Sequence, residues 1–514
     1  MNGAEALIET AIRAGIDICF ANPGTTELPL MAAMDAVSGM HAVLCLFEGV
    51  CTGAADGYGR MSGRPALTLL HHGPGLANGI ANLHNARRAR TQLVNIIGEH
   101  MTWHRDANPP LATDIASLAR PVSAWVHTAS NSQSLAAEFA DALSAACSCN
   151  GQVACLIVPM DCQQGAAAGP AALKPAQPPP QPSAERLAGA RRVLRAGQPS
   201  AILLGGPHAL SKRGLAAASR IAAASGCRLF CETFPARMER GAGFPVVEKL
   251  PYFPEQALES LSPFAHLILA GAGVPVAFFG YAGHPSRLVP RGTHQTVLAD
   301  PEEDAVTALE ELADDLDAPD RGPVASESRP ARPNGELTPR SLGEAIAAVQ
   351  PEGLIVVDEA LTSGLPYFLA SASAPPFTYL TLTGGSIGHG LPCAVGAALA
   401  CPDRRVLAFE ADGSGMYTVQ ALWTMARENL NITTVICSNR GYRILRLEMA
   451  RAGITHPGPQ SQGVTELSRP ALDWVALARG MGVPGVRVET ADAMVDQLGR
   501  VLNEAGPCLI EAII

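Results

Sequence analysis

The stretch RVLAFEADGSG (residues 405–415) indicates the fold most clearly, because an apolar run of strand length ends there in an Asp-Gly-Ser turn. The next apolar run, ITTVICSNRG (residues 432–441), ends in a similar way in Ser-Asn. Continuous Val, Ile and Leu runs that alternate with helix-length segments are typical of a parallel sheet covered on both faces. Because such sheets bind ligands beyond the carboxyl ends of their strands, these two turns are the first place to search for a site.

The two turns carry oxygen ligands and backbone donors. Asp412 and Asn439 offer side-chain oxygens, the carbonyl of Gly441 can add a third, and Gly413 and Ser414 present N–H groups at a helix start. Mg²⁺ typically takes one or two carboxylates together with phosphate oxygens and water, so the pattern predicts Mg²⁺ holding a diphosphate. The alternative is an ordinary Asp-Gly turn and a strand-capping Asn, and this segment alone does not decide between them.

The same alternation extends through the whole chain. Its 514 residues correspond to about three domains, and two Pro-rich stretches, residues 169–183 and 318–339, have the composition of linkers. We therefore predict an α/β protein of three doubly wound parallel-sheet domains, at residues 1–168, 184–317 and 338–514. The first and third segments end alike, in QVACLIVP and GPCLIEAI, which suggests two related domains.

The composition excludes several classes of function. The net charge of −10 is spread without long runs, which disfavours a surface for nucleic acid or an anionic membrane. Thirteen scattered cysteines without zinc-site spacing favour reduced thiols in a cytoplasmic protein. The N-terminus has no signal-peptide pattern, and no apolar run approaches the roughly 20 residues of a membrane span. We therefore expect no nucleic acid and no membrane among the partners.

A second candidate carboxylate lies in the first segment. Glu48 follows the apolar run AVLCLF and begins a helix of small residues, VCTGAADGYGR. Between apolar neighbours its side chain would be poorly solvated, which suits a proton donor to a ring nitrogen. A lone Glu at a strand end is more often a helix cap, so this interpretation depends on other motifs.

Five motifs of the outer segments occur together and in a fixed order. They are NPGTTEL (22–28), FEGVCTGAADGYGR (47–60), GPGLANGIANLHNARRA (73–89), GGSIGHGLPCAVGAALA (384–400) and FEADGSGMYTVQALWTMARENLNITTVICSNRGYRIL (409–445). In this combination the chain resembles thiamine-diphosphate-dependent enzymes of the acetolactate synthase, benzoylformate decarboxylase and pyruvate oxidase type. Its length and its opening, MNGAEALIETAIRAGIDICFANPGT, are most similar to those of acetolactate synthase large-subunit-like proteins.

The resemblance implies thiamine diphosphate and Mg²⁺ as cofactors, held by a pyrimidine-binding, a central and a diphosphate-binding domain. Glu48 matches the glutamate that hydrogen-bonds N1′ of the aminopyrimidine, Asp412 and Asn439 match the side-chain metal ligands, and Gly441 matches the carbonyl ligand. The other matched positions hold the cofactor: Gly385, Ile387, Thr362, Ser363, Gly413 and Ser414. Ile387 would support the bent cofactor, the Gly385 carbonyl would hold its 4′-amino group, and the other four would lie near its diphosphate.

Two further points follow from the resemblance. The family's metal motif normally opens Gly-Asp-Gly, whereas Ala411 stands here, and this substitution fits unless the position needs a positive φ. In the family the domains that hold Glu48 and Asp412 meet across two subunits, so the resemblance implies at least a homodimer, commonly a homotetramer.

The residues expected near the substrate are Thr25, His71 and His72. The two histidines follow the strand ALTLL, and the decarboxylases of the family have a histidine at the position of His71. An imidazole can bind the carboxylate of a 2-keto acid or transfer a proton near neutral pH. Thr25 matches a substrate-contacting Ser of benzoylformate decarboxylases, although it could equally cap a helix. His104 and His389 are polar candidates nearby, each expected to be structural.

We predict a 2-keto acid decarboxylase, with or without carboligation of the product. The central segment lacks the Asp-Asp-Arg run of biosynthetic acetolactate synthases, and a lone Gly271-Ala272-Gly273 is too little to predict FAD. Gly280 stands where decarboxylases carry a second active-site histidine, with His284 four residues on. Acetolactate synthase activity on pyruvate and a non-catalytic cofactor-binding paralogue remain as alternatives.

Overall fold

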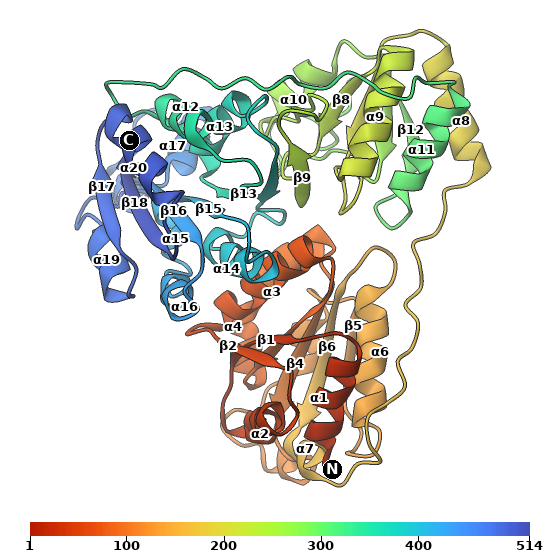
Figure 1. Cartoon of the computed structure of the whole chain (residues 1–514), viewed down its shortest axis with the longest axis vertical. Coiled ribbons are helices and arrows are strands. Elements are labelled where there is room, and N and C mark those ends of the chain that lie inside the picture. The colour runs from red at the N-terminus through yellow and green to blue at the C-terminus, as the bar shows by residue number, and fades with distance from the viewer.

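A computed structural model describes all residues from 1 to 514. It contains three α/β units, each built on one sheet, of six, five and seven strands (Figure 1). All strand pairs are parallel except one at the edge of the third sheet. The predicted fold class, three doubly wound sheets dominated by parallel strands, is confirmed.

The first unit lies at the bottom of Figure 1 and has the strand order β2-β1-β3-β4-β6-β5. Its central strands β3 and β4 are buried along their whole length, which explains why their sequences are apolar without alternation. The strands are β1 (Ile18–Asn22), β2 (His41–Leu44), β3 (Ala66–Leu70), β4 (Leu93–Glu99), β5 (Trp125–Thr128) and β6 (Val153–Pro159). The helices are α1 (Gly3–Arg13), α2 (Leu28–Ala36), α3 (Glu48–Ser62), α4 (His72–Ala89), α5 (Ile115–Ala119), α6 (Leu135–Cys147) and α7 (Met160–Gln164), with 3₁₀ turns η1 (Thr25–Glu27) and η2 (Thr102–Ala107).

The second unit has the order β10-β8-β7-β11-β12 and lies at the upper right of Figure 1. Its strands are β7 (Ser200–Leu204), β8 (Arg228–Cys231), β10 (Glu248–Lys249), β11 (His266–Ala270) and β12 (His294–Ala299). Its helices are α8 (Ala184–Arg195), α9 (Lys212–Ser225), α10 (Pro254–Leu261) and α11 (Ala305–Asp315). A strand from this part of the chain, β9 (Arg237–Arg240), does not join its sheet.

The third unit has the order β17-β18-β16-β15-β13-β14, and β9 pairs antiparallel with β14 at its edge. The strands are β13 (Ile355–Glu359), β14 (Phe377–Thr381), β15 (Val406–Ala411), β16 (Ile432–Ser438), β17 (Gly485–Val488) and β18 (Cys508–Ile513). The helices are α12 (Pro339–Val349), α13 (Gly364–Ala370), α14 (Gly390–Ala400), α15 (Asp412–Gly415), α16 (Ala421–Arg427), α17 (Arg443–Arg451), α18 (Pro459–Gly463), α19 (Trp474–Gly480) and α20 (Ala491–Val501), with a 3₁₀ turn η3 (Leu361–Ser363).

The first and third sheets share one topology. Numbered from the first strand of each unit, both run 2-1-3-4-6-5, because β13 to β18 pair in the same pattern as β1 to β6. The two units are therefore related in architecture, as their similar final strands suggested.

Helices α3 and α14 join these two units (Figure 1). A Cβ on Gly396 of α14 would lie 1.8 Å from the Ala54 carbonyl oxygen of α3, and a Cβ on Gly57 would lie 2.1 Å from the Cys393 oxygen. Only glycine permits such close packing, and one apolar core runs across the contact.

Residues 169–183 have no regular secondary structure and run as an extended strap beside the first two units (Figure 1). The second Pro-rich stretch, residues 318–339, includes the start of α12, because Thr338 caps this helix and the helix begins at Pro339. All thirteen cysteines are free, and none of the helices combines the length and apolar character needed to cross a bilayer.

Candidate active site

The two related sheets reverse their strand order at equivalent places. The reversal lies between β1 and β3 in the first sheet and between β13 and β15 in the third. Ligands of doubly wound sheets bind at such switch points, beyond the carboxyl ends of the strands. The segments that follow these four strands contain eight of the residues predicted from sequence: Thr25, His71, His72, Thr362, Ser363, Asp412, Gly413 and Ser414.

The backbone is strained in three of the loops at these strand ends. His72 after β3, Leu361 after β13 and Arg440 after β16 have φ values of 50°, 51° and 55°. Each such non-glycine residue costs about 1–3 kcal/mol, and such residues concentrate at ligand sites. The strain is therefore consistent with a binding role for both switch points.

Glu48 is the first residue of α3 and is 9% exposed. Its Oε2 accepts a hydrogen bond of 3.0 Å from the Asn78 side chain, and Gly75 leaves room for Oε1, since a Cβ there would lie 3.3 Å from it. Both partners come from α4. The carboxylate is thus held in one orientation, with no Lys or Arg ion-paired to it.

His71 is paired with a buried acid that the sequence interpretation missed. Its Nδ1 lies 2.7 Å from Oε2 of Glu27, which is fully buried and also accepts the Gly24 N–H. Thr25 is exposed on the same turn and makes no capping hydrogen bond, so the cap of this turn is Glu27. The spacing Gly-Thr-Thr-Glu could have indicated this, because an acid three residues into a turn commonly accepts such an N–H.

His72 is buried beside the end of β4. It is 1% exposed, and its Nδ1 lies 3.5 Å from Oε1 of Glu99, at the end of β4. Burial alone would raise the pKa of Glu99, but the nearby His72 imidazole and the hydrogen bond from the His100 backbone N–H outweigh it and lower that pKa. Of the two predicted histidines, His71 is the more accessible, with a quarter of its side chain exposed.

Asp412 and Asn439 are brought together as their strand-end positions suggested. Oδ2 of Asp412 accepts the backbone N–H of Arg440 at 2.6 Å, and Oδ1 of Asn439 accepts that of Gly441 at 3.0 Å. Burial raises the pKa of Asp412 to about 6, although hydrogen bonds from Arg440 and Gly413 oppose the shift. No Lys or Arg forms an ion pair with this carboxylate, so a bound cation would satisfy it.

The other residues predicted to lie near a diphosphate follow the ends of β13 and β15. Gly413 lies under the ring of Tyr442, Ser414 is buried beside it, and the Ser363 hydroxyl is buried without a hydrogen-bond partner. Thr362 is half-buried on η3. Ala411 is extended, with φ −87° and ψ 145°, so its methyl group fits without strain and the departure from Gly-Asp-Gly leaves the loop undisturbed.

The loop that carries Gly385 and Ile387 is anchored by α4. Asn82 donates to the Gly388 carbonyl at 3.1 Å, and Asn85 donates to the Ser386 carbonyl at 2.8 Å. Gly385 has φ 74°, which favours glycine, and the ring of Phe278 lies 3.6 Å from the position of a Cβ there. The structure therefore places Phe278 of the central unit beside this loop, while Gly280 and His284 are exposed.

Two buried acidic groups support the same loop from behind. Glu359 accepts the N–H groups of Gly388 and Gly390, and burial raises its pKa to about 7. Burial and the neighbouring Glu359 raise the pKa of Glu410. Both shifts favour the protonated form of these carboxyl groups, and no sequence pattern indicated the pair.

His389 belongs to a buried ion-pair network, as expected for a structural residue. Its Nε2 lies 2.8 Å from Oδ2 of Asp56, which also pairs with Arg60. Burial alone would raise the pKa of Asp56, but Arg60 and His389 outweigh it and lower that pKa to about 2. His104 is exposed on η2, with its ring centroid 5.8 Å from that of His100.

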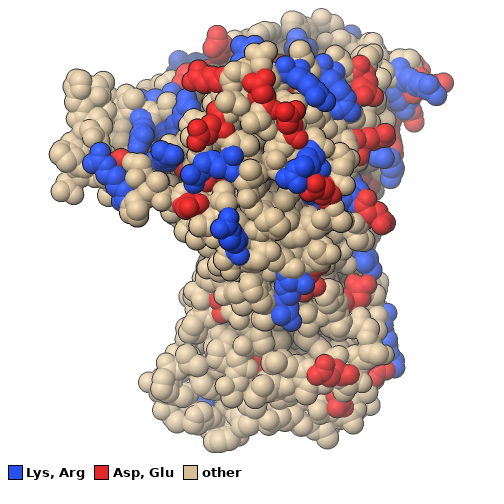
Figure 2. Space-filling view, turned by 60° about the vertical axis from the view of Figure 1, so that its left-hand side comes forward, with Lys and Arg blue, Asp and Glu red and all other residues tan.

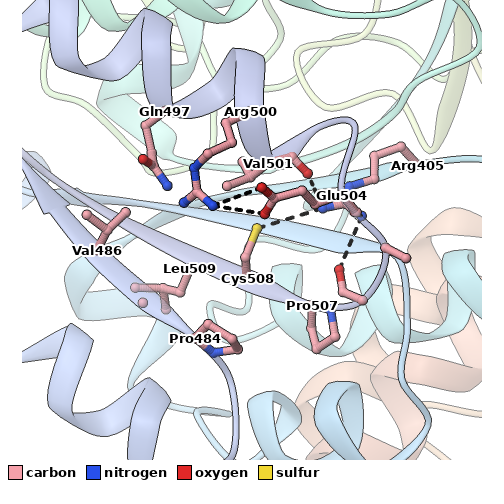
Figure 3. A pocket seen from close by; sticks show the side chains of 13 residues that line it. Arg405, Pro484, Val486, Gln497, Arg500, Val501, Glu504, Pro507, Cys508 and Leu509 are labelled. Atoms are coloured by element: carbon pink, nitrogen blue, oxygen red, sulfur yellow. Dashed lines mark hydrogen bonds and ion pairs between the residues drawn. The ribbon is translucent and has the colours of Figure 1, made fainter.

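Two pockets have linings that do not include Asp412. One, at the carboxyl ends of the central strands, is lined by Gly271, Gly273 and Glu232 and by Arg87 and Arg88 of α4. Burial raises the pKa of Glu232 to about 7. The other lies where β17 and β18 begin, beside Arg405, whose guanidinium donates to the carbonyls of Val501, at the end of α20, and of Glu504 in the loop that follows (Figure 3). This pocket lies at the amino ends of the strands of the third sheet, whereas Asp412 lies at the carboxyl end of β15.

Two related α/β units, one with a buried glutamate at a helix start and the other with a carboxylate–amide pair at a switch point, define the class of enzymes that hold a diphosphate cofactor between paired domains. Residues 1–118 match the N-terminal TPP-binding domain of thiamine pyrophosphate enzymes, and residues 367–512 match the C-terminal TPP-binding domain. The chain belongs to the thiamine pyrophosphate enzyme family.

Three relatives show the extent of the similarity. The "Putative acetolactate synthase large subunit IlvX" of Mycobacterium tuberculosis is 50% identical over 516 residues, covering 100% of this chain and 99% of that protein. Benzoylformate decarboxylase of Pseudomonas aeruginosa is 29% identical, covering 98% of this chain and 97% of that enzyme. The solved thiamine diphosphate-dependent 4-hydroxybenzoylformate decarboxylase of Rhodococcus jostii RHA1 has the same fold, with a TM-score of 0.86 at 23% identity over 100% of this chain and 99% of that one.

Proposed function

We propose that the protein binds thiamine diphosphate with Mg²⁺ and decarboxylates a 2-keto acid, with or without ligation of the resulting acyl unit to a second carbonyl compound. The observation that carries this proposal is the Asp412 carboxylate, which is buried at a switch point, has a pKa raised to about 6 and lacks a cationic side chain. Mg²⁺ bound to Asp412, Asn439 and the Gly441 carbonyl would supply the missing charge. Gly413, Ser414, Thr362 and Ser363 would hold the diphosphate, and the unpartnered Ser363 hydroxyl supports this placement.

When bound, thiamine diphosphate supplies a carbon nucleophile and an electron sink next to the substrate carbonyl. Glu48 would hold a proton at N1′ of the aminopyrimidine, and Asn78 would keep that carboxylate oriented. Gly385 and Ile387 would fix the position of the pyrimidine relative to the thiazolium.

His71 is the residue that we propose for the substrate carboxylate or for proton transfer. The buried Glu27, at 2.7 Å from Nδ1, would hold the imidazole ring in one orientation, with Nε2 free to face the substrate. Thr25 lies exposed on the adjacent turn and could add a hydroxyl contact. His72 is enclosed, so we assign it no direct contact with substrate.

The cofactor claim is tested by calorimetric titration of the full chain with thiamine diphosphate in the presence of Mg²⁺. Stoichiometric binding is expected, and no binding would refute the proposal. Glu48→Gln should still bind the cofactor but lose about 10²–10⁴-fold in kcat, because general acid–base catalysis contributes about that much. Unchanged turnover would remove the role assigned to Glu48.

The substrate is tested with a panel of 2-keto acids that includes pyruvate, benzoylformate and branched-chain acids, monitored for CO₂ and for acyloin products. Acetolactate from pyruvate would favour the second candidate, acetolactate synthase, which the 50% identity to the M. tuberculosis protein supports. Cofactor binding without any product would instead indicate a non-catalytic paralogue.

We also propose that the active sites form between two copies of the chain. Large apolar side chains are exposed on elements beside the site: Leu46, Leu365, Leu369 and Tyr417 are 45%, 52%, 65% and 54% exposed. Figure 2 shows one face of the first unit with few charged groups, whereas charges gather on the upper units. An apolar face next to a site is expected where a second subunit covers it.

Mixing two inactive variants tests this arrangement. In a shared site, a heterodimer of Glu48→Gln and Asp412→Asn subunits has one site with both lesions and one with neither, so random mixing should restore about a quarter of the wild-type activity. No recovery, despite heterodimers detected by mass spectrometry, would place each site within one chain.

A further inference from the structure

The carboxyl ends of β3 and β4 hold a cluster of side chains that the proposed reaction does not use. His72 follows β3, and Glu99 and His100 lie at the end of β4. Because the first and third sheets share one strand order, these positions correspond to those of Asp412 after β15 and Asn439 after β16. The cluster thus occupies in the first unit the place that the proposed Mg²⁺ ligands occupy in the third.

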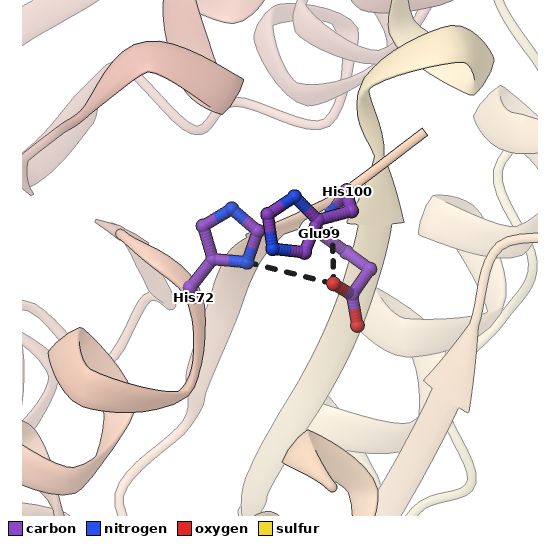
Figure 4. Close-up of side chains that lie close together, drawn as sticks. All are labelled: His72, Glu99 and His100. Carbon is purple, nitrogen blue, oxygen red and sulfur yellow. Dashed lines mark hydrogen bonds and ion pairs between the residues drawn. The ribbon is translucent and has the colours of Figure 1, made fainter. Parts of the chain in front are cut away.

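The three side chains converge. One ligand atom from each, a ring nitrogen of His72, a carboxylate oxygen of Glu99 and a ring nitrogen of His100, lies within 4.8 Å of the other two (Figure 4). The imidazole centroids of His72 and His100 are 4.2 Å apart, and Nδ1 of His72 is 3.5 Å from Oε1 of Glu99.

Three of the four nitrogens of the two imidazoles are buried without a hydrogen-bond partner. His72 is 1% exposed, yet neither of its ring nitrogens makes a hydrogen bond, and Nε2 of His100 is buried and unpartnered as well. An unsatisfied buried polar atom costs about 1–3 kcal/mol. His72 also has a φ of 50°, so the chain holds this ring against Glu99 in a strained conformation. Such a cost is retained where the groups bind something.

We propose that His72, Glu99 and His100 form a binding site for a first-row transition-metal ion of the Zn²⁺ type, distinct from the Mg²⁺ site at Asp412. Two imidazoles and one carboxylate are a ligand set that Zn²⁺ accepts with a fourth position open, whereas Mg²⁺ prefers oxygen ligands only. At tetrahedral Zn²⁺ with bonds of about 2.0–2.1 Å the ligand atoms lie about 3.3 Å apart, so binding draws the three side chains together by up to about 1.5 Å. The guanidinium of Arg105 acts on Glu99 electrostatically, and its positive charge opposes binding of a cation here.

The test uses the full-length protein, stripped with a chelator and then saturated with Mg²⁺ and thiamine diphosphate so that the Asp412 site is filled. Calorimetric titration with ZnCl₂ should show about one equivalent bound per chain, and Co²⁺ should give the intense visible absorption of a four- or five-coordinate site with nitrogen ligands. No stoichiometric Zn²⁺ binding, or only the weak Co²⁺ spectrum of octahedral oxygen coordination, would overturn the proposal.

Variants locate the ion. Glu99→Gln and His100→Gln should each weaken Zn²⁺ binding at least about tenfold and abolish the Co²⁺ absorption. His127→Gln is a matched control, because His127 on β5 also lies beside an acid, with Nε2 3.4 Å from Oε1 of Glu138, but has no second histidine in the cluster. Equal loss in the control, or unchanged binding in both ligand variants, would refute the assignment, and circular dichroism of each variant shows whether it is folded.

Discussion

Gly396→Ala tests the close contact between α3 and α14, on which the relative position of the two cofactor-binding units depends. The new Cβ would lie 1.8 Å from the Ala54 carbonyl oxygen and 2.5 Å from the Tyr58 nitrogen, both backbone atoms that no rotamer change can move. A carbon needs about 3.3 Å from a carbonyl oxygen, so the helices must separate by about 1.5 Å.

The energy balance is unfavourable. Replacing glycine by alanine inside a helix gains about 1 kcal/mol, while overpacking of this kind costs about 1–3 kcal/mol or more. Because the clash is with backbone, we place the cost above that range and expect a net loss of about 2 kcal/mol. For a unit of this size that corresponds to a fall in Tm of about 4–8 °C.

Gly499→Ala in α20 is the matched control, because it lies in a helix and a Cβ there meets nothing within 4 Å. It should stabilise the protein by about 0.5–1 kcal/mol. Thermal unfolding followed by circular dichroism compares the two. If Gly396→Ala unfolds at the same temperature as Gly499→Ala, the added Cβ is accommodated between α3 and α14 without the expected cost in the free energy of unfolding.

A functional consequence accompanies the loss of stability. Helix α3 begins at Glu48, and α14 begins one residue after His389 at the end of the Ile387 loop. Separating the helices displaces these residues, and a misplacement of about 1 Å can cost about 10²-fold in rate. At 25 °C we expect the loss in kcat of Gly396→Ala, expressed as a free energy, to exceed its loss in the free energy of unfolding. A folded variant with wild-type kcat would refute the link.

Three further perturbations have defined outcomes. Asp56→Ala removes one partner of a fully buried ion pair and should cost about 3–5 kcal/mol in chemical denaturation, whereas Glu310→Ala, at an exposed pair, should cost less than about 1 kcal/mol; equal effects would contradict the network. The pKa of Glu232 is raised from 4.5 to about 7, so its ionisation lowers stability as pH rises through this range; Glu232→Gln should match the wild type in Tm at pH 4.5 but be more stable by about 3 kcal/mol above pH 7, and parallel pH profiles would refute this. Asp412→Asn should weaken Mg²⁺-dependent cofactor binding at least about tenfold in calorimetry, and unchanged affinity would place the metal elsewhere.

Much of the site could be predicted because its chemistry lies at strand ends. The apolar runs mark β15 and β16 without ambiguity, so Asp412 and Asn439 had to lie at one edge of the sheet, and the structure puts their backbone partners next to one another. Glu48 could be predicted for the same reason, because it directly follows an apolar run. The roles of these residues stay predictions until cofactor binding is measured.

Other features depend on contacts that are distant in sequence. Asp56 and Arg60 are four residues apart on α3 and could have been paired from helical periodicity, but His389 joins them from the third unit. His71 and His72 are neighbours in sequence, yet the left-handed backbone of His72 turns one ring toward Glu27 and the other toward Glu99, and no sequence pattern indicates a positive φ at a histidine. The shared strand order of the outer sheets likewise follows from pairings that only the folded chain shows.

The antiparallel strand β9 has a consequence for the synthesis of this chain and for its truncation. It covers β14, which would otherwise be the open edge of the third sheet, yet it is synthesised more than a hundred residues earlier. A fragment that starts at residue 338 lacks β9, so β14 becomes an exposed edge strand whose N–H and C=O groups are unpaired. Such a fragment should self-associate through β14. A synthetic peptide containing residues 237–240 should pair with β14 and keep the fragment in solution.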